Sequence, residues 1–155
     1  MKRLLLSVIV TLYSVFSWAQ SSVVQMGEAV VRCNDFAFAK TMLLNEGLSI
    51  VKSSKLNNAN TVVLSNGSES TYSILYVTLT KYVASKKIAT VEFKFHPNGR
   101  FYSSFCRDLT QWGYSYYYDN DGLCFKDMYN KGTYYIGVNA DEQNWMEVTF
   151  CREVK

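Results

Sequence analysis

Two neighbouring segments of the chain alternate between apolar and polar residues, and few folds can accommodate that pattern. In segment 72–83, positions 75, 77, 79 and 83 are apolar, and in segment 88–95, positions 89, 91, 93 and 95 are apolar. A period of two places alternate side chains on opposite faces of a β-strand, so we expect each strand to bury its odd-numbered residues. Residues that pair across two antiparallel strands lie on the same face, so odd-numbered residues of one strand must pair with odd-numbered residues of the other. The residue numbers of each pair must therefore sum to an even value. The pattern therefore predicts an odd-length loop, such as 85–87, or a bulge.

A second pattern, in the segment 101–112, is typical of a helix that packs against such a sheet. Its apolar residues recur at spacings of four, four and three: Phe101, Phe105, Leu109 and Trp112. These spacings place the four side chains on one face of a helix. Gly113 follows, and glycine readily adopts the left-handed conformation that ends a helix. We therefore expect a helix with one buried face that stops at Gly113.

Aromatic residues dominate the next segment. Tyr114, Tyr116 and Tyr118 alternate, so they share one side of a predicted strand, and we expect that side to be core beneath the helix. Tyr117 then points the other way, beside Tyr135. Tyr and Trp are common at binding surfaces because each combines apolar area with a polar tip. The predicted binding surface consists of Tyr117, Tyr135 and Trp145.

The remaining elements are predicted from shorter signals. Asn34-Asp35 offers a helix cap, and the helix that follows should end at Gly47. Residues 23–31 are assigned to a short leading strand because they are rich in valine. Asn66-Gly67 indicates a hairpin turn. Further strands are expected at 48–55, 61–64, 124–129, 133–138 and 146–151.

Together these elements predict an α+β fold, with two helices packed on a largely antiparallel sheet system of seven to eight strands. The order of helix and strands in residues 34–95 resembles the order in residues 98–152, which suggests a tandem repeat. At an offset of 66, Leu43, Gly47 and Ser49 fall on identical residues. Two unrelated halves would also look alike if each began with a helix, a glycine and a strand.

The N-terminus has the three parts of a secretory signal peptide, which we assign to residues 1–19. Lys2 and Arg3 precede the apolar run 4–16, and the segment 17–19 supplies small residues for cleavage after Ala19. A membrane anchor is the alternative, but the run falls short of the roughly 20 residues of a comfortable span. We expect a secreted or periplasmic protein, a single mature domain of residues 20–155, and no stable membrane span after cleavage.

Four cysteines remain in the predicted mature chain, at positions 33, 106, 124 and 151. An even number in an exported protein suggests disulfide bonds, so the expectation is two bridges among Cys33, Cys106, Cys124 and Cys151. A metal site is less favoured because no pair has CxxC spacing and His96 is the only histidine. Buried free thiols are the remaining alternative.

The sequence disfavours several classes of activity. His96 precedes Pro97 in a predicted turn, and no GxSxG motif provides a nucleophile for it. No GxxxxGK or GxGxxG phosphate-binding loop is present. Without Lys2 and Arg3, 14 of the 16 basic side chains remain against 13 acidic ones, so a nucleic-acid partner is not expected. We expect no catalytic residue, no cofactor and no metal.

The expectation for function is therefore a small exported, non-catalytic binding module that uses an aromatic sheet surface. Its ligand is an unknown protein or glycan. The alternative is a structural or accessory subunit of an envelope or surface assembly, in which an edge strand such as 61–64 pairs with a partner chain. An enzyme of an unrecognised kind is the third hypothesis.

Overall fold

The computed structural model describes residues 22–56, 58–117 and 127–152, and the predicted signal peptide lies outside them. The described chain forms helices and strands in an α+β arrangement. In order they are α2 (Val23–Cys33), α3 (Phe36–Asn45), β1 (Ser49–Leu56), β2 (Ala59–Ser65), β3 (Leu75–Tyr82), β4 (Thr90–Phe95), α4 (Arg100–Gln111), β5 (Ser115–Tyr117), β6 (Asp127–Lys131), β7 (Tyr134–Ala140) and β8 (Met146–Arg152).

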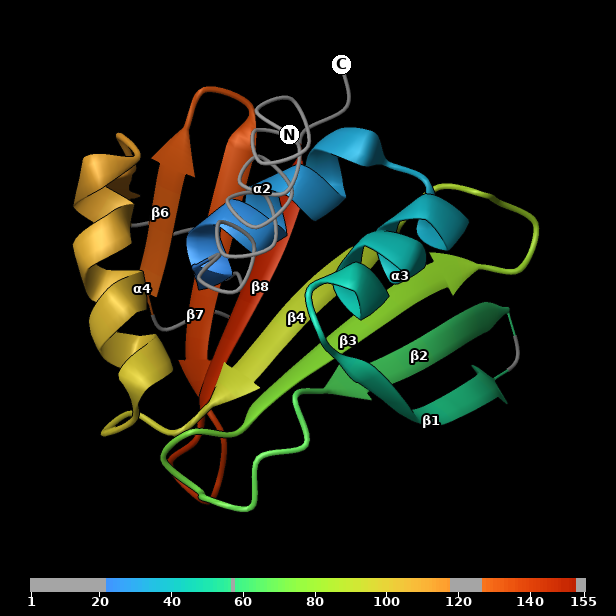
Figure 1. Cartoon of the computed structure of the whole chain (residues 1–155). Coiled ribbons are helices and arrows are strands. Elements are labelled where there is room, and N and C mark those ends of the chain that lie inside the picture. Colours follow the sequence, from blue (N-terminus) through green and yellow to red (C-terminus); the bar gives the residue numbers. More distant parts are fainter. Residues whose placement is uncertain (1–21, 57, 118–126, 153–155) are drawn as a thin grey trace, which may run out of the picture.

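All eight strands belong to one antiparallel sheet, in the order β1-β2-β3-β4-β8-β7-β6-β5 (Figure 1). Strands β1 to β4 form one meander and β5 to β8 form another, and the two join where β4 pairs with β8. Helix α3 precedes the first meander and α4 precedes the second. The predicted α+β class and antiparallel sheet are confirmed, whereas the tandem repeat stays a prediction.

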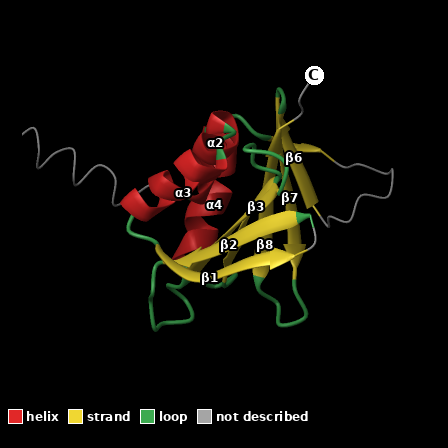
Figure 2. Ribbon diagram, turned by 90° about the vertical axis from the view of Figure 1, so that its right-hand side faces the viewer, coloured by secondary structure: helices red, strands yellow, loops and turns green. Residues whose placement is uncertain are grey.

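Three helices lie on one side of the sheet, as the turned view shows (Figure 2). Helix α2 occupies the middle, in contact with β4, β8 and both other helices. Its residue Gly27 packs directly on the ring of Phe150, and a Cβ at this position would come within 2.6 Å of ring carbons. A glycine therefore allows the helix to approach the sheet closely.

The predicted leading strand at 23–31 is wrong, because this segment forms helix α2. Ser22 caps it: the Ser22 hydroxyl accepts from the backbone N–H of Gln25, and the Gln25 side chain accepts from the N–H of Ser22. Its four valines, at positions 23, 24, 30 and 31, are all buried. They recur at i, i+1, i+7 and i+8 and so share one face of the helix, and the packing of this face overrides the preference of valine for strands.

The alternating segments behave as predicted. Every pair between β3 and β4 sums to an even number, from Leu75 with Phe95 to Thr80 with Thr90. The odd positions within these strands are buried, with the exception of Lys81 on the helix side. Two other predicted positions lie outside the strands: Val83, past the end of β3, is exposed, and Ala89, before β4, is half-buried. One apolar row crosses the sheet beneath the helices and consists of Val62, Leu79, Val91, Phe150 and Ile136.

Helix α4 and its stop are confirmed, but the aromatic segment after them is only partly core. Of the four residues predicted on its buried face, Phe105 and Leu109 are buried, Phe101 is half-buried, and Trp112, which follows the last helical residue, is exposed, so its assignment to the buried face is wrong. Gly113 has φ +77°. Tyr114 is buried as expected, whereas Tyr116 is 57% exposed, so the core assignment of Tyr116 is wrong. Strand β5 is the outermost strand of the sheet and has a neighbour on one side only, which leaves Tyr116 uncovered. Tyr118 lies outside the described residues.

Two disulfide bonds are not found. Cys33, Cys106 and Cys151 are free thiols, and Cys124 lies outside the described residues. The three thiols sit on different parts of the fold. Cys33 ends α2 and donates to the carbonyl of Val30, Cys106 is exposed on α4, and Cys151 on β8 donates to the carbonyl of Tyr135. A disulfide needs Cβ atoms about 4 Å apart, and this placement corrects the disulfide prediction for these three residues.

Candidate functional site

The side of the sheet opposite the helices is covered by no described helix, and we call it the helix-free face (Figure 2). Cross-strand partners share a face, so the register identifies its members from β3, β4, β8 and β7. They are Tyr76, Thr78, Thr80, Thr90, Glu92, Lys94, Glu147, Thr149, Cys151, Tyr135, Gly137 and Asn139. Threonine, tyrosine and charged side chains predominate, so this face differs sharply from the apolar helix side.

An ionic cluster at one end of the face links β4, β8 and the turn before β8. The Lys94 ammonium donates to Asp141 Oδ2 at 2.5 Å and to Glu147 Oε1 at 3.1 Å. Asp141 Oδ1 also accepts from the backbone N–H groups of Gln143 and Trp145, each at 2.8 Å. Burial lowers the pKa of Lys94, but the two carboxylates together raise it above its usual value. The hydrogen bond from Lys94 is the main cause that lowers the pKa of Asp141.

Glu92 lies at the centre of the helix-free face and differs from these paired groups. Its cross-strand neighbours are Thr78 on β3 and Thr149 on β8. Its carboxylate forms no hydrogen bond or ion pair with any described residue. Burial, followed by repulsion from Glu147, raises the pKa of Glu92, and attraction to Lys94 offsets this only in part. Glu92 and the adjacent ionic cluster together contain three carboxylates and one ammonium, so this part of the face has a formal charge of about −2 at neutral pH.

Aromatic rings gather at the end of the face where Trp145 lies. The Tyr72 and His96 ring centroids are 4.8 Å apart, those of His96 and Trp145 are 5.8 Å apart, and those of Tyr76 and Trp145 are 6.4 Å apart. His96 Nδ1 accepts from the backbone N–H of Asn98 at 3.1 Å, which fixes the orientation of its ring. Tyr72 is 57% exposed. The cluster therefore has both rigid and accessible rings.

The residues predicted to form the binding surface do not make a single patch. Tyr135 lies on the helix-free face between Asn130 and Cys151, whereas Trp145 lies at the opposite end of β7, beyond Ala140. Five residues of strand separate the two ends by about 17 Å. The backbone of Tyr117 pairs with Met128 at the outer edge of the sheet. Sequence reasoning missed Glu92 and Lys94, although their even positions within an alternating strand already placed them on one face.

The strand that we expected to pair with a partner chain is not an edge. Residues 61–64 belong to β2, which is hydrogen-bonded to β1 on one side and β3 on the other. The edge is β1, whose pairing shifts register between Ile50 and Lys52. A bulge and exposed lysines are features that discourage pairing between sheet edges. Residues 61–64 therefore have no free edge for a partner chain, and the assembly-subunit role itself stays a prediction.

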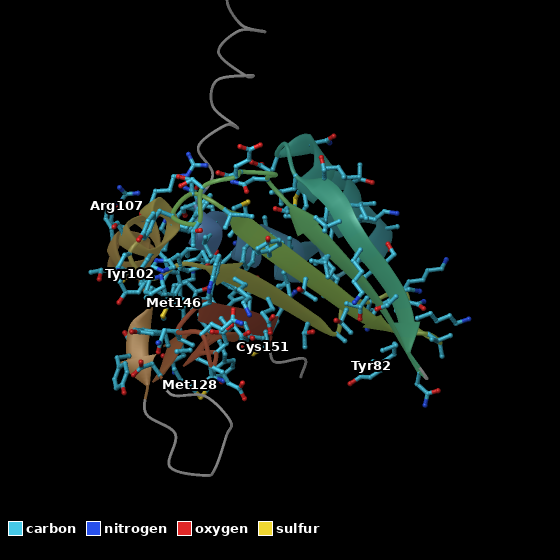
Figure 3. All side chains as sticks on the ribbon, turned by 90° about the horizontal axis from the view of Figure 1, so that it is seen from below. Tyr82, Tyr102, Arg107, Met128, Met146 and Cys151 are labelled. Atoms are coloured by element: carbon cyan, nitrogen blue, oxygen red, sulfur yellow. The ribbon has the colours of Figure 1, made fainter. Side chains whose placement is uncertain are left out.

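Two smaller features lie outside the helix-free face. Tyr102, on α4, lies at the opposite end of the molecule from Tyr82 (Figure 3). Cys106, one helical turn later, is exposed and is the main cause that raises the pKa of Tyr102. A pocket of about 70 Å³ lies where β4 and β8 stop pairing. It is lined by Val31, Asn34, Ile88, Ala89, Phe150, Cys151 and Arg152.

Within residues 22–56, 58–117 and 127–152, no three His, Cys, Asp or Glu side chains gather closely enough to hold a metal ion. No helix in the same part of the chain is long and apolar enough to cross a membrane. The single histidine, His96, has its Nδ1 engaged by Asn98 and packs between two aromatic rings.

The chain was compared with protein-family models, curated proteins and solved structures, and none of them matches it.

Proposed function

We propose that this protein is an exported, non-catalytic binding module whose helix-free face binds a protein that presents a lysine or arginine. The observation that carries the proposal is the half-buried carboxylate of Glu92, which has no partner among the described residues and lies at the centre of that face. An unpaired carboxylate in partly buried surroundings is unfavourable in the free protein. A basic side chain from a partner would relieve this cost.

The size of the face favours a protein over a small ligand. Eight strands at about 4.8 Å spacing span about 34 Å across the sheet. A standard protein interface buries about 800 Å² on each partner, which a surface of that width can supply. Tyrosine, threonine and asparagine side chains are also well suited to protein recognition, since they combine contact area with adaptable hydrogen bonding.

Charge complementarity defines the chemistry of the partner. Asp141 and Glu147 both form ion pairs with Lys94, so Glu92 is the carboxylate of this group that can pair with a cation from a partner. The rings of Tyr72, Tyr76 and Trp145 lie beside this cluster and provide apolar contact area. The partner should therefore combine one protruding basic side chain with an apolar rim.

The proposal also includes export and a tandem repeat. Export is supported by the charged start, the apolar run and the small residues that precede position 20. We expect N-terminal sequencing of the exported protein to begin at Gln20. A repeat of 34–95 in 98–152 is supported by the common order of one helix followed by four strands, and each half would then supply four strands to the binding face.

The test is affinity capture from envelope and culture-medium fractions, followed by titration of each purified captured protein. Glu92→Gln should weaken the binding of a true partner at least tenfold. Glu69→Gln removes the same charge from an exposed loop outside the sheet and should change affinity less than twofold. Affinity should also fall as salt concentration rises.

The proposal is wrong if captured proteins bind Glu92→Gln as well as wild type, or if none binds directly. A glycan array run in parallel tests whether the ligand is a glycan and not a protein. Tight binding of a neutral oligosaccharide, unaffected by Glu92→Gln, would replace the protein partner with a glycan.

A further inference from the structure

A buried ionic cluster lies on the helix side of the sheet, away from the proposed binding face. Glu28 of α2 is 2% exposed, and its Oε1 accepts from the ammonium of Lys131 at the end of β6. Its Oε2 lies 3.6 Å from Arg32, one helical turn later. The Arg32 side chain is 67% exposed, whereas that of Lys131 is 29% exposed, so Lys131 is the more buried cation.

Three aromatic rings surround the Lys131 ammonium. Its nitrogen lies 4.8 Å from the ring centroid of Tyr114, 5.5 Å from that of Trp112 and 6.0 Å from that of Tyr134. Ring faces attract cations at such distances, and cages of two or three rings are a recurrent means of binding ammonium groups. A carboxylate at the base adds a hydrogen-bond acceptor that rings alone do not supply.

The hydroxyl of Tyr114 is buried in the same cluster without a partner. It lies close to the Glu28 carboxylate, but no described atom makes a hydrogen bond of normal geometry with it. Burial, and secondly the nearby Glu28 carboxylate, raise the pKa of Tyr114 well above its usual value. A buried hydroxyl without a hydrogen bond is uncommon, and the Glu28 carboxylate is the acceptor that lies near it.

We propose that Glu28, Trp112, Tyr114 and Tyr134 form a binding site for primary alkylammonium groups, and that Lys131 is its intramolecular ligand. The site opens to solvent on the side of Trp112, which is 38% exposed. Lys131 is followed by Gly132 in a turn with φ +61°, so the lysine is delivered by a short hairpin. In this arrangement the protein's own side chain competes with any external amine.

The presence of Glu28 sets the selectivity of the site. A primary ammonium can donate a hydrogen bond to the carboxylate and also face the rings, whereas tetramethylammonium can only do the latter. The site should therefore prefer n-propylammonium, which reproduces the Lys131 side chain from Cγ to Nζ, over a quaternary ion of the same charge.

The test replaces Lys131 by alanine, adds an external amine, and measures the thermal midpoint of unfolding. In Lys131→Ala, n-propylammonium should raise the thermal midpoint saturably. Tetramethylammonium at equal ionic strength should have less than one tenth of this effect, and n-propanol should have none. Wild type should show no saturable shift, because Lys131 fills the site. Glu28→Gln combined with Lys131→Ala should lose the response, because the base of the cage is then uncharged.

The proposal is overturned if Lys131→Ala shows no saturable shift, or if tetramethylammonium matches n-propylammonium. If Lys131→Ala is unfolded in buffer, the same titration is followed by circular dichroism. Refolding by n-propylammonium alone would then support the site, and no refolding with any amine would contradict it.

Discussion

At the scale of single residues, Gly27 is a glycine with no room for a side chain, because it packs on the ring of Phe150. An added Cβ would meet three ring carbons of Phe150 at 2.6 Å, so the whole ring would have to move. Alanine is favoured over glycine within a helix by about 1 kcal/mol, but overpacking a core costs about 1–3 kcal/mol. We expect Gly27→Ala to destabilise the protein by up to about 2 kcal/mol in urea unfolding.

A second substitution tests the cause of that loss. Phe150→Leu removes ring atoms that the new methyl group would strike. The double variant Gly27→Ala/Phe150→Leu should be more stable than the sum of the two single effects, by at least about 0.5 kcal/mol. Strict additivity would mean that the two residues do not meet.

The raised pKa of Glu92 predicts how the stability of the protein depends on pH. Its pKa is raised in the folded protein, so the folded state binds a proton more tightly than the unfolded state does. The ionised carboxylate therefore opposes folding, and this penalty grows as pH rises from about 4.5 through the raised folded pKa. Glu92→Gln should be at least as stable as wild type at pH 7. Its advantage should shrink at pH 4, as measured by urea midpoints.

The prediction is contradicted if Glu92→Gln is less stable than wild type and the difference is larger at pH 7 than at pH 4. This result would mean that the carboxylate has a stabilising partner in the folded protein. The same result would weaken the proposed function, which depends on an unpartnered Glu92.

At the scale of elements, the sequence was informative where one face of an element is buried. Strands β3 and β4 and helix α4 each have one apolar side, and a period of two or 3.6 reports that directly. Helix α2 also has one buried face, because its valines recur at i, i+1, i+7 and i+8, but they were interpreted by their preference for strands. The helical spacing and the capping pair of Ser22 and Gln25 were signals in the sequence that the strand assignment did not use.

Turn residues were misleading in a similar way at Asn66-Gly67. The expected tight hairpin is a longer loop, because β2 ends at Ser65 and β3 begins at Leu75. The Asn66 side chain holds the loop by accepting from the N–H of Leu75 and donating to the carbonyl of Ser73. An asparagine that bonds to distant backbone in this way cannot be told from a turn asparagine by composition.

Leu109 tests whether α4 is anchored as the structure indicates. It is 5% exposed and lies in the main core with Phe105. Truncation of a buried leucine leaves a cavity and typically costs about 2–5 kcal/mol. We expect Leu109→Ala to lower the free energy of unfolding by that amount. Thr110→Ala, at the exposed next position, should cost less than about 0.5 kcal/mol. A loss below about 1 kcal/mol for Leu109→Ala would mean that Leu109 does not lie on the buried face of α4.

At the scale of the whole molecule, the cysteines show what a count can and cannot predict. Four cysteines in an exported chain favour two bridges, but three-dimensional placement leaves at least three thiols free. Thiol titration under denaturing, non-reducing conditions should therefore find at least three reactive groups per chain. A chain with none would restore the original disulfide prediction and require a different arrangement of α2, α4 and β8.

The candidate site likewise depends on the whole sheet. Alternation placed Glu92 and Lys94 on one side of β4, but no local pattern indicated that β8 and the turn before it would bring Asp141 and Glu147 to Lys94. The pairing of β4 with β8 joins segments more than fifty residues apart. Long-range pairing of this kind creates the ionic cluster at one end of the face, and a single sequence does not specify it.

The most direct measurement for the proposed function is an NMR titration of methyl-labelled protein with the captured partner. The methyl groups of Thr78 and Thr149, which flank Glu92 on the helix-free face, should shift on binding. Those of Val23 and Val30, which are buried residues of α2 on the other side of the sheet, should not. Shifts confined to α3, α4 or the β1 edge, with Thr78 and Thr149 unchanged, would contradict the central claim that the helix-free face binds the partner.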